Sequence, residues 1–455
     1  MKMQIALIGV IFIVWISSLN WRRSVKAVFC VIIFEGILRK WVLPQASDMI
    51  YFLKDLIIGG SYINYYFNHE TKYPFKTNGL TVLLLLATGW CLFQAFNPSL
   101  GSPIVGFFGL KTYLFYIPLM WMFPTLFQSE DDLYKNLRNY LVLAIPVCLL
   151  SIAQFFSPVS SPINVYAGGQ EATATLTGTA AVRVTGTFPY IAGYAVYLSV
   201  CFSLLIPLLT VKQSSFWRAV TLVEALLVAG TSFMTGARGL LLFEVLFLAG
   251  YACVIGLTQP SLAARCTKQI ILPSIIISGA VSTFFRSAID AFFARSANSS
   301  PETFFDRALS AFAEPFQATS LKGLDGYGTG ATHQAVSALR QVLNLRTGEL
   351  PPPSEGETGR VVLELGPFGF LFWYGLRLVL IFSLWQVFLK LKKPFLRQLA
   401  LVGFLFQAIQ ITGPVVFNNT FSLYYWFFSG LIFLLPQLER RDFLNDRQMV
   451  QEQNV

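Results

Sequence analysis

The feature that most constrains this chain is a series of apolar stretches, each long enough to cross a bilayer. A spanning helix needs about 20 mostly apolar residues, and in lipid the backbone must satisfy its own hydrogen bonds. By this criterion the sequence contains about thirteen candidate spans. They lie near residues 3–19, 25–43, 50–66, 79–97, 105–127, 139–157, 187–209, 219–235, 238–257, 269–288, 364–389, 398–415 and 421–437.

Composition supports the same class of protein. Of the 455 residues, 55% are hydrophobic and only 12% are charged, with a mean hydropathy of +0.60. Soluble domains carry roughly 25% charged residues. The sequence therefore predicts an all-α, polytopic transmembrane helical bundle of about 12–13 spans. The net charge of +10 is attributed to topology and not to nucleic-acid binding, because most Lys and Arg residues lie in short loops.

Basic residues predict how the bundle is oriented. Lys and Arg are enriched in cytoplasmic loops, and alternate loops of the predicted bundle are basic. We therefore expect the N-terminus outside and the C-terminus in the cytoplasm of a bacterial inner membrane. The basic residues on the predicted cytoplasmic side are Arg22, Arg23, Lys26, Lys72, Lys76, Lys212, Arg218, Arg265, Lys268, Lys390, Lys392, Lys393, Arg397, Arg440 and Arg441.

Four regions follow from this topology. Residues 1–287 form a transmembrane bundle of about ten spans, and 288–363 form one large extracytoplasmic loop. Residues 364–437 form three C-terminal spans, and 438–455 form a cytoplasmic tail. In the large loop, Phe304, Phe305, Leu309, Phe312 and Phe316 have helical spacing. The GLDGYGTG stretch at 323–330 predicts a turn.

Several ionisable residues fall inside predicted spans, where charge is costly. Glu35 and Arg39 are four residues apart and predict an ion pair on one helix face, with Lys40 extending to the interface. Lys54, Asp55 and Lys111 have the same interpretation. The alternative is that several of these residues line one polar cavity.

Metal chemistry is not indicated. The two histidines, His69 and His333, lack a cluster of further ligands at metal-binding spacing. The acidic run Glu130-Asp131-Asp132 is expected to be the start of a solvated helix. No cofactor is predicted.

Arginines on the predicted outer side point to an anionic ligand. The positive-inside rule predicts few of them there, and a guanidinium binds phosphate in a bidentate manner. We interpret the set as a site for an anionic lipid head group such as a pyrophosphate, although any single member can be a lipid anchor or a loop ion pair. The set comprises Arg183, Arg238, Arg286, Arg295, Arg307, Arg340, Arg346 and Arg360.

The order of short motifs resembles the superfamily of O-antigen ligases and O-antigen polymerases. Arg183-Val-Thr-Gly-Thr-Phe188 precedes the seventh span, and Thr235-Gly-Ala-Arg-Gly239 forms an outer turn. Arg307-Ala-Leu309, the glycine-rich 326–330 stretch and Glu364-Leu-Gly-Pro-Phe-Gly369 follow in order. The resemblance covers roughly residues 80–437 and lies in motif order, because each motif is short.

This resemblance implies a helical bundle similar to the GT-C fold and a metal-independent, inverting glycosyl transfer from undecaprenyl pyrophosphate outside the membrane. By motif order, Arg238 and Arg307 correspond to the pyrophosphate-binding arginines, with Arg183 as an auxiliary contact. Arg295, Arg360 and His333 are further candidates for substrate contact. The expected partners are the lipid-linked oligosaccharide donor, a glycan acceptor, membrane lipids, and chain-length regulators or export proteins.

One departure favours a polymerase over a ligase. The family's ligases carry a histidine at a fixed distance before the Gly-x-x-Gly that corresponds to Gly366 and Gly369, and here that spacing leads to Glu355. Glu355 or Glu357 is therefore the candidate base for the acceptor hydroxyl. Ligase-type transfer, a flippase for the same lipid and a non-catalytic scaffold are the alternatives.

Overall fold

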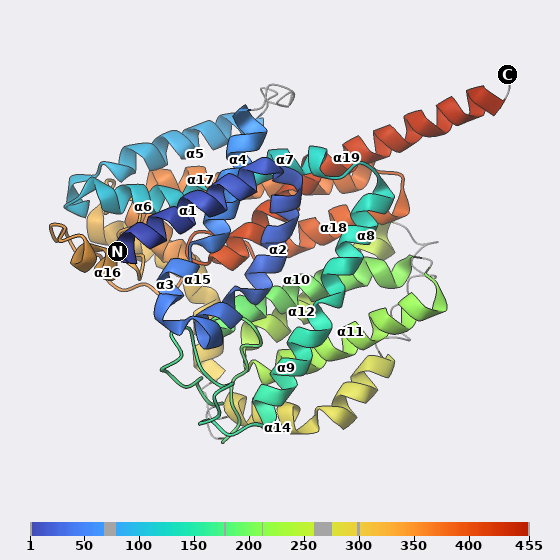
Figure 1. Cartoon of the computed structure of the whole chain (residues 1–455), viewed down its shortest axis with the longest axis horizontal. Coiled ribbons are helices and arrows are strands. Elements are labelled where there is room, and N and C mark those ends of the chain that lie inside the picture. Colours follow the sequence, from blue (N-terminus) through green and yellow to red (C-terminus); the bar gives the residue numbers. More distant parts are fainter. Residues whose placement is uncertain are drawn as a thin grey trace.

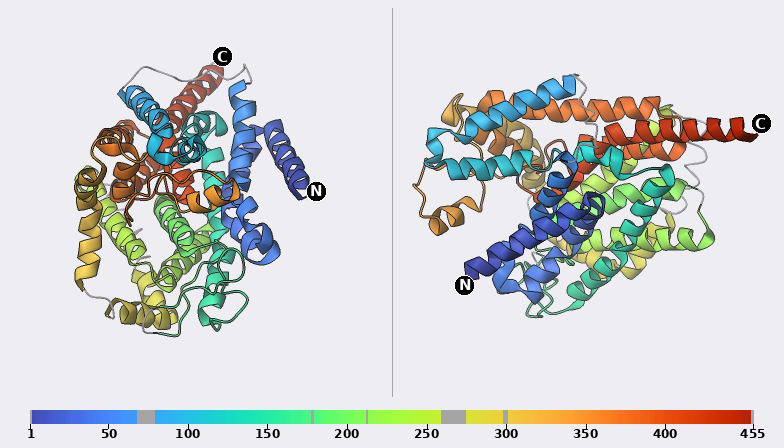
Figure 2. Two further views of the ribbon diagram at one scale, coloured as in Figure 1. Left: turned by 90° about the vertical axis from the view of Figure 1, so that its left-hand side faces the viewer. Right: turned by 45° about the horizontal axis from the view of Figure 1, so that its top comes forward.

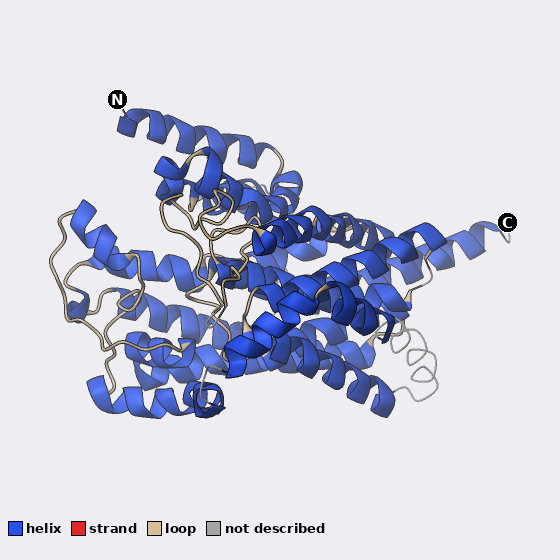
Figure 3. Ribbon diagram, turned by 90° about the horizontal axis from the view of Figure 1, so that it is seen from below, coloured by secondary structure: helices blue, strands red, loops and turns tan. Residues whose placement is uncertain are grey.

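A computed structural model describes residues 2–67, 79–176, 179–211, 213–258, 275–297 and 301–453, with side chains omitted for 2–6, 301–308, 321 and 445–453. In this part of the chain the regular structure is helical, and two isolated β-bridges lie in the loop before α10. Figure 3 shows the helices and the long loops that join them. The predicted all-α bundle is confirmed at this level.

Seven of the described helical segments are long and apolar enough to cross a membrane. They are Pro103–Leu126, Glu130–Phe156, Ile191–Thr210, Ser215–Met234, Arg238–Thr258, Glu357–Lys390 and Asn419–Leu444. An eighth forms if Ile275–Phe284 and Arg286–Ala297, bent by 84°, count as one span. Leu7–Leu19, Gly79–Ala95 and Pro394–Ile409 are apolar but shorter. The structure thus supports a multi-span membrane protein, with fewer full-length spans in the described residues than the predicted 12–13.

The N-terminal third consists of helices α1 to α7. Their bounds are α1 Lys2–Leu19, α2 Trp21–Ile37, α3 Ser47–Ile50, α4 Leu53–Phe67, α5 Gly79–Ala95, α6 Pro103–Leu114 and α7 Leu119–Leu126. The second predicted span ends early, because α2 passes into a π-helix, η1 (Leu38–Val42), before Pro44. Helical turns at Pro44–Ala46 (η2) and Pro98–Leu100 (η3) complete the connections.

The central helices differ in how far they are buried. They are α8 Glu130–Val142, α9 Ala144–Phe156, α10 Ile191–Thr210, α11 Ser215–Met234 and α12 Arg238–Thr258. Helices α10 and α19 (Asn419–Gln453) are the most enclosed of the candidate spans, with 72% and 78% of their apolar windows buried. The acidic run at 130–132 is the first turn of α8, capped by Ser129, as predicted. Negative charge at a helix N-terminus is stabilised by the helix dipole.

The large loop is mostly helical. It contains α14 Arg286–Ala297, α15 Pro301–Lys322 and α16 Val336–Val342, and it leads into α17 Glu357–Lys390. The predicted helix around 304–316 is therefore confirmed as α15, and 323–330 is a turn. Helix α18 is Pro394–Ile409. Two predicted region borders, 363/364 and 437/438, lie inside α17 and α19, because each helix runs on past its apolar stretch.

The connecting segments gather at one end of the bundle, which we call the loop end: residues 38–52, 157–176, 179–190, 235–237, 301–356 and 410–418 (Figure 2). Figure 2 (left) looks onto this end. The two termini lie on opposite sides of the molecule in Figure 1. The basic residues Lys72, Lys76, Lys212, Arg265 and Lys268, together with His69, lie outside the described residues.

Candidate functional site

Three arginine-bearing segments meet at the turn between α11 and α12. The Arg183 Nε donates to the Thr235 carbonyl oxygen at 3.0 Å, and the Arg295 Nη1 donates to the Gly236 carbonyl oxygen. Arg238 is the first residue of α12. The resemblance implied separate substrate contacts for Arg238 and Arg183, and the structure brings Arg183 and Arg295 to the turn that precedes Arg238.

Gly236 is what lets these guanidinium groups approach the turn. Its φ of +62° belongs to the left-handed region, and a Cβ there would lie 2.7 Å from Arg295 Nη1 and 3.4 Å from Arg183 Nε. Both groups therefore lie beside the same backbone position. We call Arg183, Arg295 and the turn at 235–238 the arginine turn.

The electrostatics of the arginine turn are unusual. Partial burial and the neighbouring Arg295 charge lower the pKa of Arg183 to about 10. Among the residues with described side chains, no carboxylate forms an ion pair with Arg183. The nearness of the two guanidinium groups gives the turn a positive potential, which favours the approach of an anion.

An apolar groove begins at the arginine turn. It has a volume of about 230 Å³ and lies between α10, α12 and the C-terminal end of α18. Its wall starts at Gly239, one residue after Arg238, and continues along α12 to Leu246. The opposite wall is formed by Ile409, Gln410, Thr412 and Gly413. The groove wall itself carries no arginine, but its first residue on α12 directly follows Arg238 in the chain.

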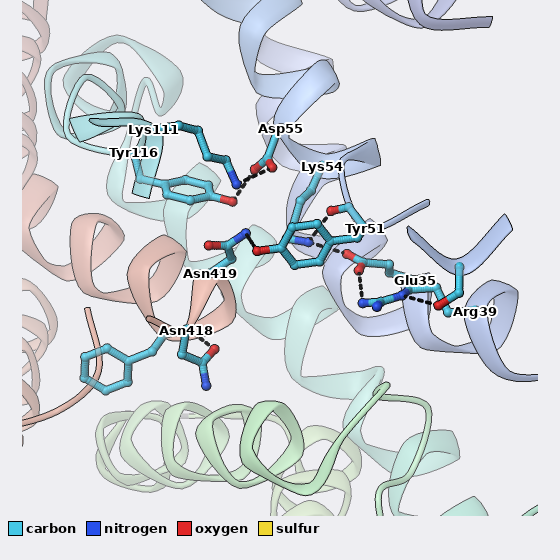
Figure 4. Close-up of polar contacts among 11 residues, drawn as sticks. Glu35, Arg39, Tyr51, Lys54, Asp55, Lys111, Tyr116, Asn418 and Asn419 are labelled. Carbon is cyan, nitrogen blue, oxygen red and sulfur yellow. Dashed lines mark hydrogen bonds and ion pairs between the residues drawn. The ribbon is translucent and has the colours of Figure 1, made fainter. Parts of the chain in front are cut away.

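A second group of charges surrounds Tyr51, which we call the Tyr51 cluster (Figure 4). Arg39 Nη1 lies 3.1 Å from Glu35 Oε1, and Lys54 Nζ lies 2.8 Å from Glu35 Oε2. Lys111 Nζ lies 2.7 Å from Asp55 Oδ2, and the Tyr116 hydroxyl donates to Asp55. The predicted Glu35–Arg39 ion pair is confirmed. Lys54 was expected to pair with Asp55, but it bonds Glu35 because Lys111 occupies Asp55.

The ring of Tyr51 collects the cations of this cluster. Lys54, Lys111 and Arg39 lie 4.6, 5.2 and 5.4 Å from its centroid. Cations are attracted to the face of an aromatic ring. Three cations and two carboxylates leave one net positive charge, and the ion pairs are linked into one cluster. That several of these residues line one polar cavity stays a prediction.

Lys40 does not extend to an interface as expected. It is 2% exposed, and its Nζ donates to Thr185 Oγ1 at 2.8 Å and to the Gly186 carbonyl oxygen at 2.9 Å. Thr185 and Gly186 belong to the same motif as Arg183. Lys40 therefore joins the end of α2 to the segment that carries the arginine turn.

His333 and Arg360 meet near Lys111. The His333 ring lies 4.9 Å from the Phe108 ring and 6.2 Å from the Phe417 ring, and the Arg360 guanidinium lies 5.1 Å from the Phe417 centroid. Burial and the charges of Lys111 and Arg360 lower the pKa of His333 to about 4. Its Nδ1 accepts the Ala335 N–H at 3.1 Å. The neutral ring therefore carries its proton on Nε2 and acts as a donor, not as a base.

The loop at 410–419 connects these groups. Its first part walls the apolar groove, and Phe417 lies against Arg360 and His333. The Asn419 Nδ2 donates to the Tyr51 hydroxyl at 2.9 Å. The arginine turn and the Tyr51 cluster are thus on two sides of one loop.

Glu357 serves to hold this loop. Its carboxylate lies 3.1 Å from Arg377 Nη1 and accepts the Val416 N–H at 3.0 Å, while Arg377 Nη2 donates to the carbonyl oxygens of Gln410 and Gly413. The sequence suggested an acidic loop residue, but Glu357 is buried at the start of α17. Both carboxylate oxygens of Glu357 are occupied, whereas Glu355, the other candidate base, is exposed.

Two carboxylates, Glu314 and Glu364, were given no role from the sequence. Glu314 of α15 accepts from Ser354 Oγ at 3.1 Å and from the Gly356 N–H at 3.2 Å, which fixes the segment that carries Glu355. Glu364 is fully buried and accepts from the backbone of Gly330 and Thr332 at 2.9 and 2.8 Å. It anchors the glycine-rich turn to α17. These roles depend on contacts between segments that are far apart in the sequence, so local patterns do not predict them.

Two further expectations concern Arg307 and metals. The Arg307 side chain lies outside the described side chains, so its predicted pyrophosphate contact stays a prediction. In the described part of the chain, no group of three or more His, Cys, Asp or Glu residues is arranged to hold a metal ion. Comparisons of the sequence with protein-family models and with curated proteins find no match.

Proposed function

We propose that this protein is a membrane-embedded glycosyltransferase that polymerises oligosaccharide repeat units carried on undecaprenyl pyrophosphate. In this proposal the loop end faces outward from a bacterial inner membrane, and the bundle is of the GT-C-like kind. The product is a surface or secreted polysaccharide.

The arginine turn is the observation that carries this proposal. Arg183 and Arg295 are held side by side, and an apolar groove begins at Gly239 beside them. A polyprenyl pyrophosphate has the complementary shape, with two phosphates next to a long apolar chain. Arginine forks bind phosphate oxygens in a bidentate manner, and low dielectric strengthens that contact.

The chemistry follows from the leaving group. A glycosyl pyrophosphate is already activated, so the enzyme must stabilise the charge that builds on the pyrophosphate as the sugar–oxygen bond breaks. Arg183 and Arg295 do this, together with Arg238 and Arg307 where the resemblance assigns them. The acceptor hydroxyl attacks the anomeric carbon from the opposite side and inverts it. Its proton passes to a carboxylate, for which Glu355 is the candidate.

Glycan chain length tests the proposal. A deletion strain is complemented with wild type, Arg183→Ala, Arg183→Lys or Arg286→Ala, and membrane levels of each protein are checked. Arg286 is the matched control, because it lies on the same helix as Arg295 but its side chain is 82% exposed. We expect Arg183→Ala to lower polymer yield by roughly a hundredfold or more, as for other lost charge-stabilising donors. Arg183→Lys should retain part of the activity, and Arg286→Ala should behave as wild type.

Other outcomes have distinct meanings. Full-length polymer in the Arg183→Ala strain contradicts the proposal. Lipid-linked units that accumulate on the cytoplasmic face indicate a flippase. Normal polymer that is not transferred to its final acceptor indicates ligase-type transfer.

A further inference from the structure

A second apolar recess opens at the loop end, away from the arginine turn. It has a volume of about 700 Å³ and lies between α1, α4 and α6. Its apolar wall includes Val10, Ile13 and Val14 of α1 and Leu56, Gly59 and Ile63 of α4. Ligand pockets for small molecules have volumes of this size.

The recess is amphipathic, with charge at one end only. Asp55 and Lys111, 2.7 Å apart, form part of its wall. From Asp55 the apolar wall continues along α4 to Ile63, which is ~12 Å at the rise of an α-helix. The Lys111 side chain pairs with Asp55 and is 18% exposed. Both residues belong to the Tyr51 cluster, which carries one net positive charge. A charge next to lipid is costly and commonly marks a binding site.

The charged end of the recess is joined to the rest of the loop end through two phenylalanines. Phe108 lines the recess and contacts His333, and Phe417 lies between His333 and Arg360. Arg360 donates to the Ser354 carbonyl oxygen and has no carboxylate partner among the described side chains. Lys111 is the cation that lines the recess, and His333 and Arg360 lie behind Phe108 and Phe417, outside its lining.

We infer that this recess binds the lipid of the acceptor: an isoprenoid chain between α1, α4 and α6, with its phosphate at Lys111. This inference rests on the proposed function, because a polymerase joins two lipid-linked glycans. The donor lipid occupies the groove at the arginine turn and the acceptor lipid occupies this recess. The loop at 410–419 stands between the two head groups.

The glycines of the recess permit a test that leaves its charges intact. A Cβ at Gly59 or at Gly9 would meet no atom within 4 Å. A leucine side chain at Gly59 therefore starts into open space, and Gly59→Leu narrows the recess. Gly256→Leu is the matched control, because Gly256 on α12 is equally open but lies outside the recess.

The experiment is photo-crosslinking of the full-length protein in nanodiscs of phosphatidylethanolamine and phosphatidylglycerol. The probe is a photoreactive geranylgeranyl monophosphate, and labelled peptides are identified by mass spectrometry. We expect labels on α1, α4 and α6 that unlabelled polyprenyl pyrophosphate displaces and excess phosphatidylglycerol does not. Gly59→Leu should reduce these labels by roughly tenfold, and Gly256→Leu should leave them unchanged. Unchanged labelling in Gly59→Leu, or equal displacement by phosphatidylglycerol, would overturn the inference.

The phosphate contact is tested with Asp55→Asn combined with Lys111→Met, which removes both charges and avoids a buried unpaired ion. We expect the labels in the recess to decrease and those in the groove near Gly239 to stay. Labels in the recess that persist would exclude Lys111 as the phosphate ligand. Failure of the proposed function gives a different pattern: normal polymer in Arg183→Ala cells, whatever the labelling of the recess.

Discussion

The His333 ring is neutral, accepts a hydrogen bond and lies near two cations, Lys111 and Arg360. Burial, Lys111 and Arg360 all act against its protonation and lower its pKa to about 4. An unperturbed histidine titrates near 6.5, so the unfolded chain binds this proton at a higher pH than the folded chain does. The stability contributed by neutral His333 is therefore present above about pH 6.5 and is lost as the pH falls towards 4.

We therefore predict that the effect of His333→Gln on thermal stability depends on pH. In detergent, the thermal midpoint of the wild type should fall between pH 7 and pH 5, and part of that fall should be missing in His333→Gln. The glutamine keeps a side-chain amide but does not titrate. Two parallel curves over this range would show that His333 does not carry the pH dependence.

At the scale of single residues, local spacing predicted some contacts and missed others. The Glu35–Arg39 pair follows from helical geometry and was predictable. The partner of Lys54 was not, because it depends on how α4 and α6 approach α2. Glu357 was expected in a solvated loop, and its contact with Arg377 lies 20 residues along a kinked helix. Long-range packing decided these cases.

Among the elements, the turn between α11 and α12 has the clearest requirement. Gly236 has a φ of +62°, and a Cβ there would lie 2.2 Å from Leu176 Cδ2 as well as close to Arg295. Side chains larger than hydrogen are strained at such a φ. The turn was predicted from the sequence, but the need for glycine comes from the segments that pack on it.

Gly236→Ala should therefore disturb both the fold and the site. We expect the free energy of unfolding to fall by about 1–3 kcal/mol and polymer length to shorten, because the arginines must move. Gly256→Ala on α12 is the control, since a Cβ at Gly256 meets no atom within 4 Å and Gly256 lies outside the groove. Thermal unfolding of purified variants and glycan length in cells measure the two effects. Equal behaviour of the two variants would contradict the tight packing described for Gly236.

Some helix boundaries follow from the hydropathy pattern, and others depend on tertiary packing. The predicted spans at 219–235 and 238–257 correspond closely to α11 and α12. Helix α17, in contrast, starts at Glu357 and not at residue 364, and it bends at Gly366, where φ is +69°. Hydropathy could not locate that start, because the first turn is stabilised by the Glu357–Arg377 pair and not by apolar residues.

For the whole molecule, the sequence predicted the class of protein better than it predicted how the helices are arranged. Apolar composition is enough to predict a helical membrane protein, since the bilayer permits few alternatives. It does not determine which helices surround a groove. The two apolar cavities and the loop between them arise from α1, α4 and α6 on one side and α10, α12 and α18 on the other. Segments far apart in sequence form each cavity.

The proposed function requires one bundle to bind two amphipathic substrates. Both cavities are mainly apolar; Lys111 lines one of them, and the other begins at Gly239, one residue after the arginine turn. The Glu357–Arg377 pair fixes the loop between them, and Glu314 fixes the segment with Glu355. In this account the bundle is a rigid frame that brings two head groups together.

Binding of a pyrophosphate lipid at the arginine turn is the central claim, and it is measured most directly with purified protein. The dissociation constant of a short-chain polyprenyl pyrophosphate is compared with that of the corresponding polyprenol for wild type, Arg183→Ala and Arg286→Ala. We predict that the pyrophosphate binds wild type and Arg286→Ala at least roughly tenfold more tightly than the polyprenol, a difference of about 1.4 kcal/mol. Arg183→Ala should lose most of that preference. Equal binding of the two lipids by wild type, or an unchanged preference in Arg183→Ala, would contradict it.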